Sequence, residues 1–272
     1  MREWGGVMVW AVFSREVRGN LKAMAAVFAS LACCAAVIAG MFNPETARML
    51  EDLKAAMPEL YDAFGMGNDT STLTGFLLNY LYGFLFTVGP LALTLLAVNR
   101  SAVRPVATGE LANVLASPHS RRSVAVSIAA AVIASVLATT ALSGLAAVAA
   151  AEALFPGALD LAAMVRVNLG LLAFQLFMAG TCLLSALALR CPGAALWMGG
   201  GFCLAEYLVQ MVVQISGTES WGRFCTFFSL FDPYALAAND AGAIGAAACL
   251  ALFGAMLTAG AVAAFSRRDL CL

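Results

Sequence analysis

Residues 124–150 read VAVSIAAAVIASVLATTALSGLAAVAA, an apolar run that contains no Asp, Glu, Lys or Arg. A helix needs roughly 20 mainly apolar residues to cross the hydrocarbon core of a bilayer, so this run is long enough to span a membrane. Five other stretches are similarly long and apolar. The sequence therefore predicts six membrane spans, over residues 24–42, 75–98, 124–150, 167–189, 194–215 and 244–265.

The composition agrees with a membrane protein. Hydrophobic residues make up 62% of the chain and charged residues only 11%, whereas a soluble domain is about 25% charged. The fold class expected is an all-α membrane protein. Six spans and their loops occupy nearly all 272 residues, so we expect a single transmembrane domain over residues 1–272, with any catalytic or energy-coupling domain on another chain.

Basic residues are distributed unequally between the loops on the two sides of the membrane. Because cytoplasmic loops carry an excess of Lys and Arg, the richer side is predicted to be cytoplasmic, which places both termini inside. That side has Arg2, Arg15, Arg18, Lys22, Arg100, Arg104, Arg121, Arg122, Arg190, Arg267 and Arg268, and the other side has Arg48, Lys54, Arg166 and Arg223.

Residues 5–22 form an amphipathic segment before the first span. Trp10, Phe13, Val17 and Leu21 recur at helical spacing, and the charged residues lie off that stripe. Such a segment is typical of a helix that lies in the membrane interface. We expect an elbow helix over residues 5–22 that leads into the first span; a frayed tail is the alternative.

A second amphipathic helix is predicted over residues 44–64, outside the membrane. Asn43, Pro44 and Glu45 together are a helix-start signal, since they supply a capping side chain, a proline at the first position and an acid in the first turn. Pro58 is expected to kink or split this helix. It is expected to cap the outer ends of the spans, with a lid or a partner-binding surface as the alternative.

The outer loop over residues 216–243 is rich in aromatic residues. It is too short and too interrupted, by Asp232 and Pro233, to cross the membrane. A re-entrant or interfacial half-helix is therefore predicted there.

The cytoplasmic loop over residues 99–123 contains a short predicted helix at 108–117. Thr108 can cap it, and Glu110 lies in its first turn, where the helix dipole favours an acid. An exposed apolar edge follows, which fits a groove on a partner protein. That edge is formed by Leu111, Val114 and Leu115, before Pro118 ends the helix.

Several kinds of chemistry are excluded by the sequence. A nucleotide-binding Walker A loop needs Gly-Lys followed by Ser or Thr, but Lys22 and Lys54 are the only lysines and each follows a leucine. His119 is the only histidine, and neither HExxH nor G-x-S-x-G occurs. The eight cysteines have no CxxC spacing, and the basic residues form no stripe of the kind that binds nucleic acid. We therefore predict no catalytic residue, no metal and no cofactor on this chain, and no nucleic-acid partner.

Glu206 is the one ionisable residue deep in a span. A carboxylate at that depth costs roughly 2.5–3.5 kcal/mol on insertion scales, so it should face protein or water. Gln210 and Gln214 follow it on the same helix face, and the predicted stripe is either a set of interhelical hydrogen bonds or the lining of a translocation path. The polar residues of other spans that can join it are Gln175, Asn168 and Asn79.

The loop sequence TGELANVLASPHSRR at residues 108–122, preceded by Asn99 and Arg100, resembles the cytoplasmic loop of six-helix ABC exporter permeases. In that family an acidic, glycine-containing turn leads to a Leu-Leu or Val-Leu pair, a Ser/Thr-Pro and a Ser-Arg. Residues 58–65 with 75–77, and the closing FSRRDL at 265–270, are similar to the family's first outer loop, second span and C-terminal tail.

The resemblance implies a permease subunit that is not itself an enzyme. Two such subunits, identical or different, pair in the membrane, and two cytosolic ATPase subunits bind ATP beneath them. Glu110, Leu111, Val114 and Leu115 would contact the ATPase together with the elbow helix. The chain departs from many relatives at residues 104–107, where it has Arg-Pro-Val-Ala instead of acids.

The function expected is that of a permease subunit of an ATP-driven ABC transporter, an exporter in a bacterial plasma membrane. The cargo is left open. The alternative is a non-transporting membrane sensor or assembly factor that uses the helix at 108–117 to dock a cytosolic partner. A membrane-embedded enzyme is disfavoured, because no His, Asp or Cys cluster is present.

Overall fold

A computed structural model describes residues 8–43, 49–50, 52–53, 55–59, 72–110, 119–189, 191–216 and 226–267. The regular structure of these residues is helical throughout, and six of the helices are long and apolar enough to cross a membrane. The prediction of an all-helical protein with six spans is confirmed.

Five spans are single helices: α1 (Trp10–Gly40), α8 (Arg121–Leu154), α9 (Leu161–Ala188), α10 (Pro192–Ser216) and α13 (Ala241–Arg267). The remaining span, Leu73–Ala107, is composite. It consists of α4 (Leu73–Leu77), the π-helical turn η1 (Leu78–Tyr82), α5 (Leu85–Val98), a second π-helical turn η2 (Asn99–Val103) and α6 (Arg104–Ala107). Two short helices, η3 (Phe227–Leu230) and α12 (Pro233–Ala237), lie between α10 and α13 in the chain.

Capping side chains determine where several helices begin. The Ser120 hydroxyl accepts the backbone N–H of Ser123 at 3.1 Å, and an Asp160 carboxylate oxygen accepts that of Ala163 at 3.0 Å. Asp240 caps α13 in the same way through Ala243. These residues satisfy backbone donors that the first turn of a helix leaves free. The helices therefore extend beyond the apolar runs, into the polar residues that cap them.

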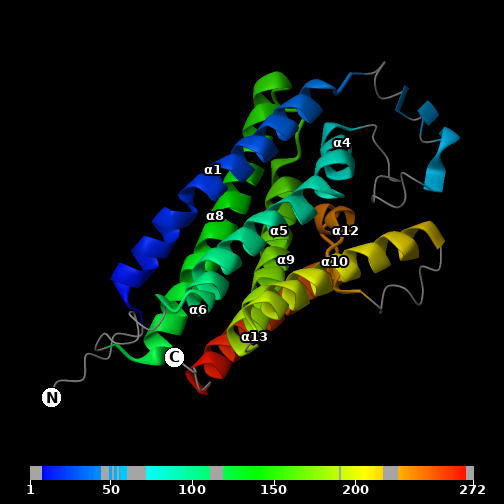
Figure 1. The fold of residues 1–272 in the computed structure, drawn as a ribbon. Helices are drawn as coiled ribbons and strands as arrows, with labels where there is room; N and C mark the ends of the chain where they lie inside the picture. Colours follow the sequence, from blue (N-terminus) through cyan, green and yellow to red (C-terminus); the bar gives the residue numbers. More distant parts are fainter. Residues whose placement is uncertain are drawn as a thin grey trace.

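Helix α9 is the centre of the bundle and contacts α5, α8, α10, α12 and α13. Its Leu171, Phe174 and Met178 side chains are buried. In Figure 1, α1 runs along α8, whereas α10 and α13 lie on the other side of α9. The outer helices keep broad exposed apolar faces, including Trp197, Leu208 and Val212 on α10, as expected of surfaces that meet lipid.

Three hydroxyl groups inside α8 are satisfied by their own helix. Ser135, Thr139 and Ser143 each donate to the carbonyl four residues earlier, at 2.7 to 2.9 Å. Such back-bonding gives these three hydroxyls a partner in an apolar environment, whereas the buried hydroxyl of Thr140 in the same helix has none within the described part of the chain. Close packing of α8 in the bundle is thus compatible with these three polar residues.

The first span differs from the prediction of a separate elbow helix over residues 5–22. Residues 10–40 form one uninterrupted helix, and no proline occurs between Trp10 and Gly40. The beginning of α1 is attached to α8, since the Val9 N–H donates to the Ser127 hydroxyl at 2.7 Å. Trp10 and Leu21, from the predicted apolar stripe, are exposed.

The two predicted helices outside the spans are only partly described. In the range 44–64, residues 49–50, 52–53, 55–56 and 58–59 are helical, and Met57, before Pro58, is not. Thr108 does not begin a helix as predicted; it ends α6, where its hydroxyl donates to the Arg104 carbonyl at 3.1 Å. Gly109 then has a φ of 75°, a conformation that favours glycine and commonly ends a helix. Glu110, within the predicted helix at 108–117, is helical and exposed, and Leu111, Val114 and Leu115 lie outside the described residues.

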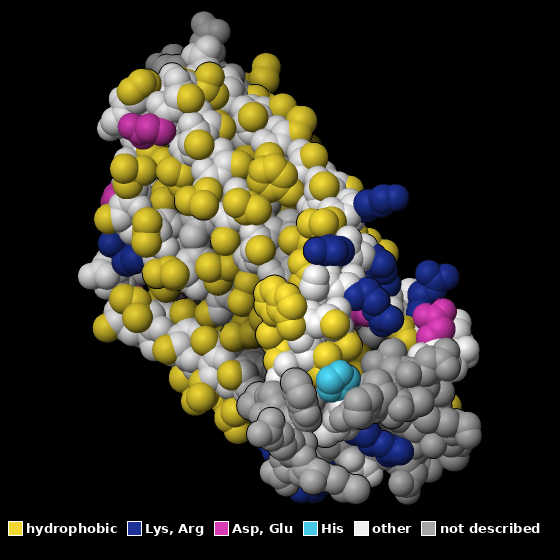
Figure 2. Space-filling model, turned by 90° about the vertical axis from the view of Figure 1, so that its left-hand side faces the viewer, with side chains coloured by type: hydrophobic (Ala, Val, Ile, Leu, Met, Phe, Trp, Pro, Cys, Tyr) yellow, Lys and Arg dark blue, Asp and Glu magenta, His cyan; other side chains and the backbone are white. Residues whose placement is uncertain are grey.

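Basic residues of several spans meet at one end of the bundle. Figure 2 shows Lys and Arg side chains gathered at one end of a broad apolar surface. The Arg100 guanidinium of η2 lies against Gly19 of α1, where an added Cβ would clash with it. Arg122 of α8 and Arg267 of α13 line a common groove. This end also contains the beginning of α1 and the end of α13 (Figure 1).

Candidate functional site

Residues 226–237, called the inserted segment below, enter the helix bundle between α10 and α9. The ring centroids of Phe228 and Phe174 lie 4.8 Å apart, as do those of Phe227 and Phe177. Phe174 and Phe177 lie in the middle of α9, so the segment reaches the middle of the bundle. Figure 1 shows α12, in orange, and this short helix contacts α9. The described part of the loop for which a re-entrant or interfacial half-helix was predicted thus contains the short helices η3 and α12.

The polar face of α10 holds the beginning of the inserted segment. The Glu206 carboxylate accepts the backbone N–H of Phe227 at 3.1 Å, and the Gln210 side-chain oxygen accepts the Thr226 hydroxyl at 2.5 Å. Phe227 is the first residue of η3, so the acid lies at a helix N-terminus, where the backbone dipoles favour negative charge. Glu206 and Gln210 are half-buried, and the predicted stripe thus contacts protein here.

The end of the inserted segment is held by α9. The Arg166 guanidinium donates to the carbonyls of Leu236, at 3.0 Å, and Ala237, at 2.6 Å. These are the last carbonyls of α12, where a cation is favoured. At the other end of α12, Asp232 accepts the backbone N–H groups of Tyr234 and Ala235. An acid therefore closes the N-terminus of this short helix and a base closes its C-terminus.

Gln175 is fully buried and pairs with α5. Its amide nitrogen donates to the Phe86 carbonyl at 3.1 Å and to the Thr87 carbonyl at 2.9 Å. Pro90 has no N–H, so the Phe86 carbonyl four residues earlier has no helical partner. The Gln175 amide supplies the missing donor. The structure therefore does not bring Gln175 next to Glu206, and its side chain has no exposed surface.

The two asparagines of the predicted polar set have separate partners. The Tyr234 hydroxyl donates to Asn79 at 2.9 Å, which links the inserted segment to the π-helical turn η1. The Tyr82 hydroxyl donates to Asn168 at 3.1 Å, between the second span and α9. π-helical turns in α-helices are frequent at functional sites. Asn79 thus belongs to the site, and Asn168 lies beside Tyr82.

Sequence reasoning missed several residues of this site. Arg166 was assigned to the outer loops, although its position directly before a predicted span was a signal that it stays close to the bundle. Thr226 and Tyr234 had no signal beyond the aromatic content of their loop. Gln214 is half-buried on the same face of α10 as Gln210.

The arrangement positions an interrupted helix against α9 and α10. Interrupted helices at membrane depth are common where transporters bind substrates and ions, since they present polar backbone groups away from lipid. Comparisons of the chain with protein-family models, curated proteins and solved structures found no match.

Proposed function

We propose that this chain is the permease subunit of an ATP-driven ABC exporter. The observation that carries the proposal is the loop sequence at 108–122, which resembles the coupling loop of such permeases, on a chain with six spans. The lack of a Walker A loop in the sequence fits a subunit whose ATP is bound by a separate partner.

The proposed assembly has two permease subunits and two cytosolic ATPase subunits. Its orientation follows from the basic end of the bundle, which the positive-inside rule assigns to the cytoplasm of a plasma membrane. Glu110, Leu111, Val114 and Leu115 would receive the ATPase there. Because α1 is one continuous helix, a push on its first turns would be carried along the whole first span.

We propose that the transport path runs beside the inserted segment. Glu206, Gln210 and Gln214 form the half-buried polar face of α10, and the segment lies against the first two of them. A change in the spacing of α9 and α10 would expose this face. Gln175 supports α5 from behind the proposed path instead of lining it.

Purification of the chain from its native membrane tests the proposal. A permease subunit should bring down a protein with a Walker A loop, identified by mass spectrometry, and the complex should hydrolyse ATP. Leu111→Arg with Leu115→Arg should remove both the ATPase protein and the activity, because a charged edge does not fit an apolar groove.

The matched control is Leu53→Arg, an exposed position in the predicted outer helix. It should leave the complex intact. Recovery of a partner without a nucleotide-binding loop would instead favour the sensor or assembly factor.

A further inference from the structure

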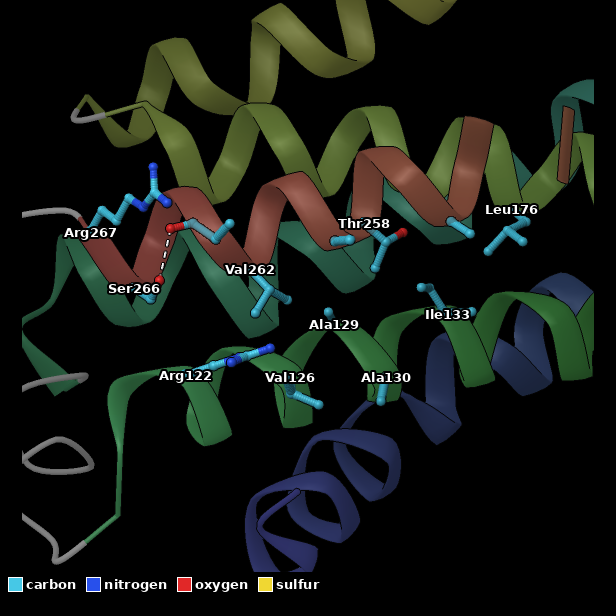
Figure 3. Close-up of a pocket in the computed structure, with 13 residues that line it drawn as sticks. Arg122, Val126, Ala129, Ala130, Ile133, Leu176, Thr258, Val262, Ser266 and Arg267 are labelled. Carbon is cyan, nitrogen blue, oxygen red and sulfur yellow. Dashed lines mark hydrogen bonds between the residues drawn. The ribbon is translucent and has the colours of Figure 1, made fainter. Parts of the chain in front are cut away.

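A groove of about 680 Å³ runs between α8 and α13, on the surface of the bundle. Val126 and Ile133 of α8 form one wall, Thr258 and Val262 of α13 form the other, and Leu176 of α9 also lines it. Figure 3 shows Ile133 of α8 and Val262 of α13 in the space between the two helices. The volume lies within the range of small-molecule sites in proteins.

The walls are apolar because their hydroxyl groups are already bonded. Thr258 donates to the Gly254 carbonyl and Ser266 to the Ala263 carbonyl, both at 2.8 Å. The rest of the lining is largely Ala, Val, Ile and Leu. A hydrocarbon chain is therefore a better occupant than a polar solute.

Two arginines stand at one end of the groove. Arg122 is in the first turn of α8 and Arg267 is the last residue of α13, and both are exposed. The helices run antiparallel, so both cations lie at the same membrane level (Figure 3). Among the described residues the one ion pair is between Arg15 and Glu16, so neither Arg122 nor Arg267 is paired with a carboxylate from that part of the chain.

The length of the groove matches one leaflet. From Arg122 to Ile133 the α8 lining covers three turns, about 16 Å at about 1.5 Å per residue. Half of a hydrocarbon core of about 30 Å is about 15 Å. A lipid whose phosphate lies at the arginines would thus place its acyl chain along the whole apolar part.

We propose that this groove is a binding site for an anionic glycerophospholipid of the leaflet at the basic end. The two guanidinium groups bind the phosphate and the negatively charged headgroup, and one acyl chain lies between α8 and α13. This proposed lipid site does not depend on the proposed transport function, since only the membrane spans and the two arginines form it.

Native mass spectrometry of the detergent-purified chain tests the headgroup contact. Two probes with the same acyl chains are compared, dioleoyl phosphatidylglycerol and the zwitterionic dioleoyl phosphatidylcholine. The wild type should retain phosphatidylglycerol preferentially, and Arg122→Gln with Arg267→Gln should weaken its retention roughly 10- to 30-fold, as expected for the loss of two cations at a headgroup.

The charge control is Arg18→Gln with Arg104→Gln, two exposed arginines that do not line the groove. This pair changes the net charge equally and should keep the preference. Equal retention of the two lipids by the wild type, or an equal loss in the control pair, would overturn the proposal.

A second pair of variants tests the acyl chain. Ala259 lines the groove and is exposed, so Ala259→Phe should fill it and reduce phosphatidylglycerol retention without a change of charge. Ala248→Phe is the control, at an exposed position of α13 outside the groove. Wild-type retention in Ala259→Phe, or evidence that a second copy of the chain dissociates when the groove is filled, would exclude the lipid as the occupant.

Discussion

At the residue scale, Pro90 and Gln175 form a complementary pair. The proline removes one backbone donor from α5, and the buried amide of α9 restores it through the Phe86 carbonyl. A buried carbonyl without a partner is costly in a low-dielectric interior. The glutamine thus makes a proline tolerable inside a span.

We predict that Gln175→Leu lowers the free energy of unfolding by about 1 to 2 kcal/mol, the upper range for hydrogen bonds between membrane helices. The measurement is reversible unfolding in mixed micelles. In a Pro90→Ala background residue 90 regains its N–H and can bond Phe86 itself, so the same substitution should cost less. An equal cost in both backgrounds would show that the amide does not compensate for the proline.

Glu206 gives a second prediction at this scale. Glu206→Gln keeps an oxygen that can accept the Phe227 N–H, whereas Glu206→Leu removes the acceptor. With Phe227→Cys as a reporter in a cysteine-free background, Glu206→Leu should raise the rate of labelling by a water-soluble maleimide several-fold, and Glu206→Gln should change it little.

The control for this experiment is Leu204→Ala, on the exposed face of the same helix. It should leave the labelling rate unchanged. If Glu206→Gln also folds normally but abolishes transport, the carboxylate acts in the proposed path as well as in holding the segment.

At the element scale, α9 and α13 pack through two glycines. A Cβ on Gly254 would lie 2.7 Å from the backbone nitrogen of Phe177, and a Cβ on Gly180 would lie 2.7 Å from the Gly254 carbonyl oxygen. Small residues of this kind allow two helix backbones to approach closely. Such packing matters in a membrane, because the hydrophobic effect does not drive helices together in lipid. The helices meet where only glycine fits.

Gly254→Ala should therefore destabilise the protein by about 1 to 3 kcal/mol, since a methyl group would push against backbone atoms. Gly245→Ala is the matched control on the same helix, because nothing lies within 4 Å of its added Cβ. It should be neutral or stabilising by up to about 1 kcal/mol, because alanine is the better helix former. Equal effects of the two substitutions would argue against the close contact.

At the scale of the whole molecule, the predicted topology can be tested with single cysteines. His119→Cys at the basic end should react with an impermeant maleimide only after the cells are permeabilised. Ala158→Cys, exposed between α8 and α9, should react in intact cells. The reverse pattern would invert the orientation and remove the proposed ATPase contact.

The sequence was sufficient for the six spans, because apolar length alone requires them in a bilayer. It was not sufficient for the helix ends, since capping residues such as Asp160 extend α9 beyond its apolar run. The expected elbow merged with the first span, because amphipathic spacing cannot tell an interfacial helix from the beginning of a longer one.

The sequence predicted several residues of the candidate site, but not which of them contact one another. The half-buried polar face of α10 and the aromatic insertion were both visible in the sequence, yet nothing there indicated that Glu206 would hold Phe227. Gln175 contacts α5 instead of Glu206, because the Phe86 carbonyl lacks the N–H that Pro90 cannot supply. Tertiary contacts between distant residues decide these details.

Thr226 and Phe227 are tied to α10, whereas Leu236 and Ala237 are tied to α9. The inserted segment therefore connects α10 to α9. If α10 moved along α9, the inserted segment would be stretched until either Glu206 or Arg166 lost its hydrogen-bond partners. Because a partly buried charged group that loses its partners is costly, the inserted segment opposes movement of α10 along α9.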